Sequence, residues 1–158
     1  RGILLALEPM PLTNVVTIAQ GRDLVEAASH PAVGLCVDVW HVERGRSPLA
    51  DVRNLPVERI VAVEIDDAPA ERVGSFFEDT IFNRRLPGEG DFDVAGFVDA
   101  IRATGFDGPW GVEILSEVQR RLPVNEAVDA AFGAAKVALG EADPAAPLKA
   151  VPTVATHR

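Results

Sequence analysis

The run Ile60-Val61-Ala62-Val63-Glu64 is a short apolar stretch that ends on a carboxylate, and the chain shows this pattern four times. The other three runs span residues 3–8, 33–38 and 110–113. Apolar residues that follow one another without alternation are typical of strands covered on both faces of a sheet. The four runs therefore predict four strands of a buried, parallel sheet.

The segments between these runs have the periodicity of amphipathic helices. The helices that we predict are residues 17–29, 48–54, 93–104 and 123–139. Strands that alternate with helices indicate an α/β protein with a parallel sheet. Residues 66–92 are rich in Asp, Pro, Gly and Arg and predict a long loop. Loops of that length in a compact domain are usually functional or mobile.

Four βα units fit either a small doubly wound sheet or half of a (β/α)₈ barrel. A complete barrel needs about 250 residues, whereas this chain has 158. No glycine-rich phosphate-binding turn follows the first run, which disfavours a dinucleotide-binding sheet. The chain opens directly on an apolar run without a methionine, and we expect an upstream half to be missing from it. Residues 140–158 are rich in Pro and Ala and predict a tail.

The composition narrows the classes of partner. The formal net charge is −9 and the pI is about 4.7, so the chain repels phosphate backbones and anionic lipids. We therefore expect neither a nucleic-acid nor a membrane partner, and no apolar run is long enough to span a bilayer. The single cysteine, Cys36, predicts a small buried side chain in a reducing compartment. With no signal peptide recognised at residues 1–7, we expect a cytoplasmic location by default.

The acidic residues that end the four runs are the candidate metal ligands. They are Glu8, Asp38, Glu64 and Glu113. The carboxyl ends of parallel strands meet on one face of a barrel, and acids crowded there need a cation to stay ionised. Oxygen ligands suit Mg²⁺ or Mn²⁺, and one histidine extends the range to Co²⁺ or Zn²⁺. Each acid alone is most simply a helix cap or a loop residue, but their repetition favours a shared metal.

His41 follows Asp38 by three residues, just beyond a predicted strand end, where its ring can reach the substrate or the ligands of the metal. Trp40 is either a packing residue or part of the pocket lining. The other two histidines are predicted to be structural or solvated, and the polar residues beyond His41 to form a solvated loop. These residues are His30, His157, Glu43, Arg44 and Arg46.

The segment 84–93, Arg-Arg-Leu-Pro-Gly-Glu-Gly-Asp-Phe-Asp, predicts a tight turn before a helix. Asp91 or Asp93 would cap that helix. The functional interpretation is that Arg84 or Arg85 is held over the mouth of the site, where a guanidinium binds a carboxylate, a phosphate or a hydroxyl group of the substrate.

These motifs together resemble the second half of the xylose isomerase-like TIM barrels, a superfamily that includes the sugar phosphate isomerases and epimerases. The similarity covers roughly residues 3–139. It is carried by Leu7-Glu8-Pro9, Val37-Asp38-Val39-Trp40-His41, residues 60–67, residues 84–93 and residues 111–115. The resemblance implies that residues 1–139 are the C-terminal half of the barrel, its last four βα units.

The resemblance also implies roles for individual residues. Glu8, Asp38 and Glu113 match metal-ligand positions of the family, and His41 matches a histidine that contacts substrate. Glu64 stands where the family has His or, in some dehydratases, Gln. This departure either adds a negative ligand, which favours a harder cation, or signals altered activity.

The function implied is that of a metal-dependent sugar or sugar phosphate isomerase or epimerase. The metal would polarise the carbonyl of a sugar or polyol ketone, and Glu8 or Glu113 would transfer the proton of the neighbouring carbon. Two alternatives remain open. One is a dehydratase of the inosose or 3-dehydroshikimate type, and the other is a non-catalytic half-barrel. A half-barrel leaves strand edges unpaired, so we also predict self-association.

Overall fold

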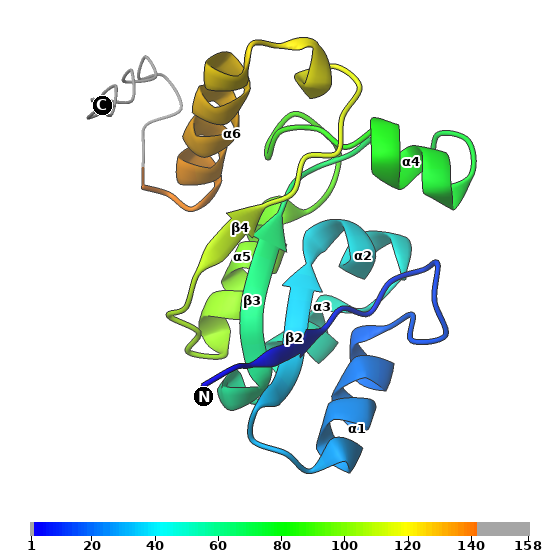
Figure 1. Ribbon diagram of the computed structural model, residues 1–158, viewed down its shortest axis with the longest axis vertical. Coiled ribbons are helices and arrows are strands. Elements are labelled where there is room, and N and C mark those ends of the chain that lie inside the picture. Colours follow the sequence, from blue (N-terminus) through cyan, green and yellow to red (C-terminus); the bar gives the residue numbers. More distant parts are fainter. Residues whose placement is uncertain (1, 142–158) are drawn as a thin grey trace.

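The structure is a computed structural model that describes residues 2–141 (Figure 1). Four strands form one sheet in the order β1-β2-β3-β4, and each neighbouring pair is parallel. The strands are β1 (Leu5–Leu7), β2 (Val33–Asp38), β3 (Ile60–Ile65) and β4 (Trp110–Val112). The prediction of a parallel α/β sheet of four βα units is confirmed, and β1 and β4 are its two edges.

The helices that follow the strands agree with the predicted positions. They are α1 (Ile18–Ala28), α3 (Leu49–Arg53), α5 (Val94–Ala103) and α6 (Val124–Ala138), with single 3₁₀ turns at η1 (Val57–Arg59) and η2 (Gln119–Arg121). In Figure 1, α1, α3 and α5 lie against one side of the sheet. The core between them contains the fully buried side chains of Leu35, Val63 and Phe97.

Two short helices were not predicted. Helix α2 (Val39–Arg44) begins directly at the end of β2, where a loop was expected. Helix α4 (Phe76–Phe82) lies within the predicted loop 66–92, and Ser75 and Glu78 form a capping box at its start. Both helices lie beyond the carboxyl ends of the strands in Figure 1. The segment after β3 is therefore more ordered than its composition indicated.

Three further predictions concern burial and the chain end. Cys36 was expected to be buried, but it is partly exposed. Most of the predicted tail, residues 142–158, falls outside the described residues, so its boundary stays a prediction. None of the helices within residues 2–141 combines the length and the apolar character that crossing a bilayer requires.

Candidate metal centre

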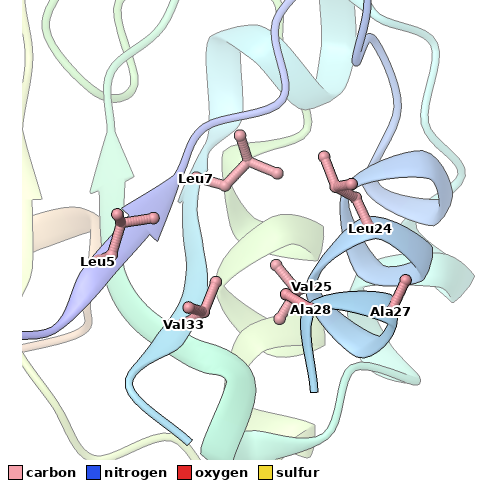
Figure 2. Close-up of a pocket in the computed structure, with 7 residues that line it drawn as sticks. All are labelled: Leu5, Leu7, Leu24, Val25, Ala27, Ala28 and Val33. Carbon is pink, nitrogen blue, oxygen red and sulfur yellow. The ribbon is translucent and has the colours of Figure 1, made fainter. Parts of the chain in front are cut away.

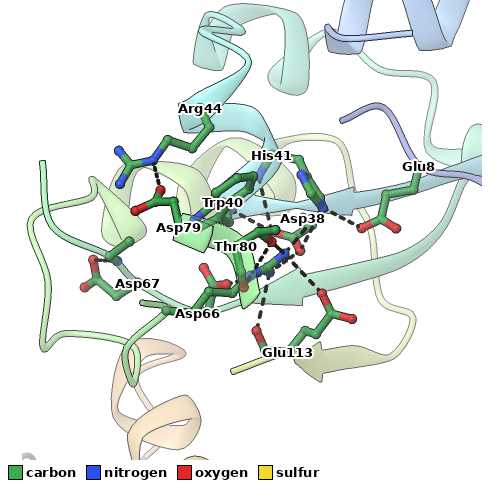
Figure 3. A network of polar contacts seen from close by, with 12 residues as sticks. Glu8, Asp38, Trp40, His41, Arg44, Asp66, Asp67, Asp79, Thr80 and Glu113 are labelled. Atoms are coloured by element: carbon green, nitrogen blue, oxygen red, sulfur yellow. Dashed lines mark hydrogen bonds and ion pairs between the residues drawn. The ribbon is translucent and has the colours of Figure 1, made fainter. Parts of the chain in front are cut away.

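The carboxyl ends of all four strands bring the predicted acids to the same end of the sheet. Asp38 is the last residue of β2 and pairs in register with Glu64 near the end of β3. Glu8 and Glu113 follow the last residues of β1 and β4. Figure 3 shows Glu8, Asp38 and Glu113 around a common centre with His41. Parallel strands therefore place residues from distant parts of the chain in one polar site.

Asp38 has two structural roles that use different oxygens. Its Oδ1 accepts hydrogen bonds from the backbone N–H groups of Trp40 and His41, at 2.6 and 3.4 Å, and so caps α2. Its Oδ2 faces the site and lies 3.8 Å from Nε2 of His41. The interpretation of this acid as a helix cap is therefore confirmed, and its other oxygen leaves the role of a metal ligand open as a prediction.

Four residues offer ligand atoms close enough to share one cation. One atom from each of Glu8, Asp38, His41 and Glu113 lies within 4.8 Å of the others. Carboxylate and imidazole donors of this kind suit Zn²⁺, Co²⁺ or Mn²⁺. Oε1 of Glu8 is also buried, and its polar neighbour among the described residues is Nε2 of His41, 3.3 Å away, with no hydrogen bond formed. The donor set therefore fits a divalent metal.

Glu64 is the one of the four predicted ligands that does not belong to the group of Glu8, Asp38, His41 and Glu113. Its carboxylate clusters with Glu8 and with the thiol of Cys36, again within 4.8 Å. Glu8 is thus shared between two groups of donors, and the role of Glu64 as a ligand stays a prediction. His41, predicted to contact substrate, instead lies among the candidate ligands, with its Nε2 3.3 Å from Oε1 of Glu8.

Burial and crowding shift the protonation of this site. Burial, followed by the negative charges of Asp38 and Glu64, raises the pKa of Glu8 to about 7. Burial lowers the pKa of His41 to about 4, so its ring is neutral at physiological pH. Burial also raises the pKa of Glu64. A neutral imidazole and a carboxyl that titrates near neutrality are suited to metal binding and proton transfer.

Arg84 lies inside the site and not over its mouth. It is 2% exposed, and its Nη1 donates to Oδ2 of both Asp38 and Asp66 at 2.7 Å. Its Nη2 lies 3.2 Å from Oε2 of Glu113, and Thr80 accepts further hydrogen bonds from the guanidinium. The guanidinium therefore neutralises the acids, and its predicted role in substrate binding stays a prediction.

The other two predicted substrate residues lie in different surroundings. Trp40 is fully buried, and the guanidinium of Arg84 lies 5.0 Å from the centre of its ring. His41 meets the same indole edge-on at 5.0 Å between ring centres. Arg85 is exposed, and its side chain donates to the carbonyl of Glu89. Trp40 therefore packs against two residues of the site, Arg84 and His41, whereas the hydrogen bond of the Arg85 side chain goes to Glu89.

Arg44 was predicted to lie in a solvated loop, and this was wrong. Its Nε donates to Oδ2 of Asp79 at 2.7 Å, and its side chain is only 8% exposed. The same guanidinium donates to the carbonyls of Pro69 and Ala70. Arg44 thus joins the end of α2 to α4 and to the segment after β3, which holds these elements over the site.

Asp66 and Asp67 are two polar residues of this region that the sequence analysis did not single out. Asp67 accepts backbone hydrogen bonds from Ala68, Gly88 and Phe92, and so fixes the predicted turn before α5. Asp66 lies in the site against Arg84. The signal that could have found them is the pair of acids that directly follows β3.

The fold and the site together define a partial (β/α) barrel with a polyanionic site at the carboxyl ends of its strands. Comparison with known proteins agrees with this class. The sequence profile of the Xylose isomerase-like TIM barrel family matches residues 1–134. The chain belongs to this family, as the resemblance in its motifs predicted.

Individual relatives support the family assignment and differ in activity. The chain is 32% identical to a 3-dehydroshikimate dehydratase of Pseudomonas putida, over 80% of this chain and 20% of that protein. It is 26% identical to an inosose isomerase of Bacillus subtilis, over 82% of this chain and 46% of that protein. The chain thus spans about a fifth of the first relative and just under half of the second.

A solved structure shows the same arrangement of elements. The crystal structure of the IOLI protein with a bound zinc atom superposes with a TM-score of 0.80 at 25% identity. The match covers 89% of this chain and 50% of that one. The four strands described above therefore correspond to part of a larger TIM barrel.

Proposed function

We propose that this site binds a divalent metal and catalyses proton transfer next to the carbonyl group of a small polyhydroxylated ketone. The observation that carries the proposal is the convergence of Glu8, Asp38, His41 and Glu113, whose ligand atoms lie within 4.8 Å of one another. When bound to these donors, a divalent cation supplies Lewis-acid polarisation of a carbonyl oxygen. Glu64 is a further candidate ligand from the sequence pattern.

The residues of the chain would supply the acid–base chemistry. Glu8, whose side chain is 28% exposed beside the proposed metal, is the candidate to accept and return a proton. Its carboxylate would remove the proton from the carbon beside the carbonyl and return it to a neighbouring carbon or to the other face. The first outcome is isomerisation and the second is epimerisation. Glu113, on the opposite strand edge, is the second acid–base candidate, and neutral His41 would orient a substrate hydroxyl.

A dehydratase is the second candidate function, and the 32% identity to a 3-dehydroshikimate dehydratase favours it. The same proton removal leads to dehydration when the hydroxyl group β to the carbonyl leaves. Product analysis after incubation with inosose, 3-dehydroshikimate and a panel of ketoses separates the two: rearranged ketoses indicate the isomerase, and an unsaturated product indicates the dehydratase.

The metal proposal is tested by calorimetric titration of chelator-treated protein with Mn²⁺ and Zn²⁺. Glu113→Gln should weaken binding by about tenfold or more, the lower range expected for loss of a group that tunes a metal site. Glu117→Gln is the matched control, because Glu117 is half exposed and pairs with Arg121 on the surface. Absence of metal binding by the wild-type chain would contradict the proposal and favour a non-catalytic half-barrel.

A further inference from the structure

Asp66 is a buried carboxylate whose position is only partly explained by its contacts. It lies one residue beyond β3 and is 1% exposed. Its Oδ2 accepts a hydrogen bond from Nη1 of Arg84, but its Oδ1 is buried without a partner among the described residues. A buried carboxylate oxygen without a hydrogen bond is costly, so Oδ1 of Asp66 is free to accept a bond from a nearby donor.

The donor is already beside it. Arg84 is shared between Asp66 and two candidate metal ligands: Nη1 also donates to Oδ2 of Asp38 at 2.7 Å, and Nη2 lies 3.2 Å from Oε2 of Glu113. A divalent cation on Asp38 and Glu113 therefore competes with the guanidinium for these two carboxylates, and at Asp38 for Oδ2, because Oδ1 caps α2. Metal binding would leave Arg84 with fewer hydrogen-bond acceptors unless another carboxylate accepts the bonds that it loses.

We propose that Asp66 is a positioning residue that receives Arg84 when a divalent metal occupies Asp38 and Glu113. A guanidinium pairs best with a carboxylate through two parallel hydrogen bonds, and Asp66 now uses one of its two oxygens. The second pairing uses the free Oδ1 and replaces the contact that Asp38 gives up. The guanidinium lies over the Trp40 ring, 5.0 Å from its centre. This inference rests on the proposed metal site.

The test is a double-mutant cycle on metal affinity, measured by calorimetric titration of Mn²⁺ into wild type, Asp66→Asn, Arg84→Gln and the double variant. Asp66→Asn should weaken Mn²⁺ binding by about tenfold, within the range of coupled sites, because Arg84 then stays on the metal ligands. Arg84→Gln should tighten binding, because it removes the competing cation. In the Arg84→Gln background, the substitution of Asp66 should change the affinity little.

An equal loss from Asp66→Asn in both backgrounds would overturn the inference, because it would show that Asp66 acts through its charge alone. Should Arg84→Gln fail to fold, arginine-labelled wild type and Asp66→Asn are compared by NMR on addition of Zn²⁺. The Arg84 guanidinium resonances should shift in wild type and much less in Asp66→Asn, and unchanged wild-type resonances would again overturn it. A wild-type chain that binds no metal contradicts the proposed function as well, whereas metal binding without coupling contradicts only the role of Asp66.

Discussion

Two regions within residues 2–141 differ in almost every property although they adjoin at the end of strand β1. One is the metal-site cluster of Glu8, Asp38, His41 and Glu113 at the carboxyl ends of the strands. The other is a groove of about 510 Å³ between β1 and α1 (Figure 2), which we call the β1–α1 groove. It is lined by Leu5, Leu7, Leu24, Val25, Ala27, Ala28 and Val33.

The change between the two regions takes place within two residues. Leu7 lines the apolar groove, and Glu8, the next residue, belongs to the polar cluster. A strand contributes its sides to packing, whereas its carboxyl end is free to present chemistry. Among the described residues, the buried charged side chains gather at or beyond the carboxyl ends of the strands, so substitutions at that end and along the sides of the sheet should have different effects.

The largest loss of stability should come from replacing Arg84, whose buried guanidinium pairs with the acids of the site. Arg84→Met leaves Asp38 and Asp66 buried without their partner, and breaking such a pair typically costs about 3–5 kcal/mol of unfolding free energy. Urea unfolding of the metal-free protein at pH 7 measures it. The matched control is Arg85→Met, which removes an exposed arginine and should stay within about 0.5 kcal/mol. Similar losses for both variants would contradict the assignment of Arg84 to the interior.

For leucine residues near the β1–α1 groove, the loss of stability on substitution by alanine should depend only on how deeply the side chain is buried. Leu35 is completely buried beneath α1, and Leu35→Ala should cost about 2–5 kcal/mol in urea unfolding through the cavity that it leaves. Leu24, on the rim of the β1–α1 groove, is 49% exposed, and Leu24→Ala should change stability by less than about 0.5 kcal/mol. A large loss at Leu24 would show that another surface covers the groove in solution.

The positions of the strands and of the main helices could be predicted because apolar runs and helical periodicity are local signals. The order of the strands in the sheet followed only from the family resemblance, because four βα units also fit a doubly wound sheet. Helix α4 was missed, although Ser75 and Glu78 have the spacing of a capping box. The Asp, Pro, Gly and Arg content of residues 66–92 outweighed that signal. Helix α2 was missed because the polar residues that follow His41 were interpreted as a solvated loop, although Asp38, its cap, had the residue type of a helix cap.

The acids of the site could be predicted because each ends a strand, and the topology brings strand ends together. Which of these residues share one cluster of ligand atoms could not be predicted, because this depends on side-chain directions that sequence spacing does not specify. Glu64 thus groups with Glu8 and Cys36, while His41 joins the main cluster. The burial of Arg84 likewise depends on Asp66, which contacts it from a different element.

Gly21 links the two regions and should show an intermediate effect. It lies in α1, where a Cβ atom would approach the ring of Pro9 to 2.5 Å and Leu35 to 3.1 Å. Alanine normally stabilises a helix, but overpacking here should cost about 1–3 kcal/mol in unfolding free energy. Because Pro9 follows Glu8 directly, Gly21→Ala should also weaken Mn²⁺ binding in calorimetry. A stabilised variant with unchanged metal affinity would show that Pro9 moves aside without disturbing Glu8.

The smallest effect should be the pH dependence that Glu8 confers on the metal-free protein. Its pKa is raised from 4.5 to about 7 on folding, so its contribution to stability is fully present below pH 4.5 and is lost as the pH rises to 7. The change should be about 1 kcal/mol, because a side chain that is 28% exposed is partly screened by water. Urea unfolding of wild type and Glu8→Gln in chelator, at steps between pH 4.5 and 8, measures it as the difference between the two curves. Parallel curves would mean that Glu8 is not held by the negative charges of the cluster.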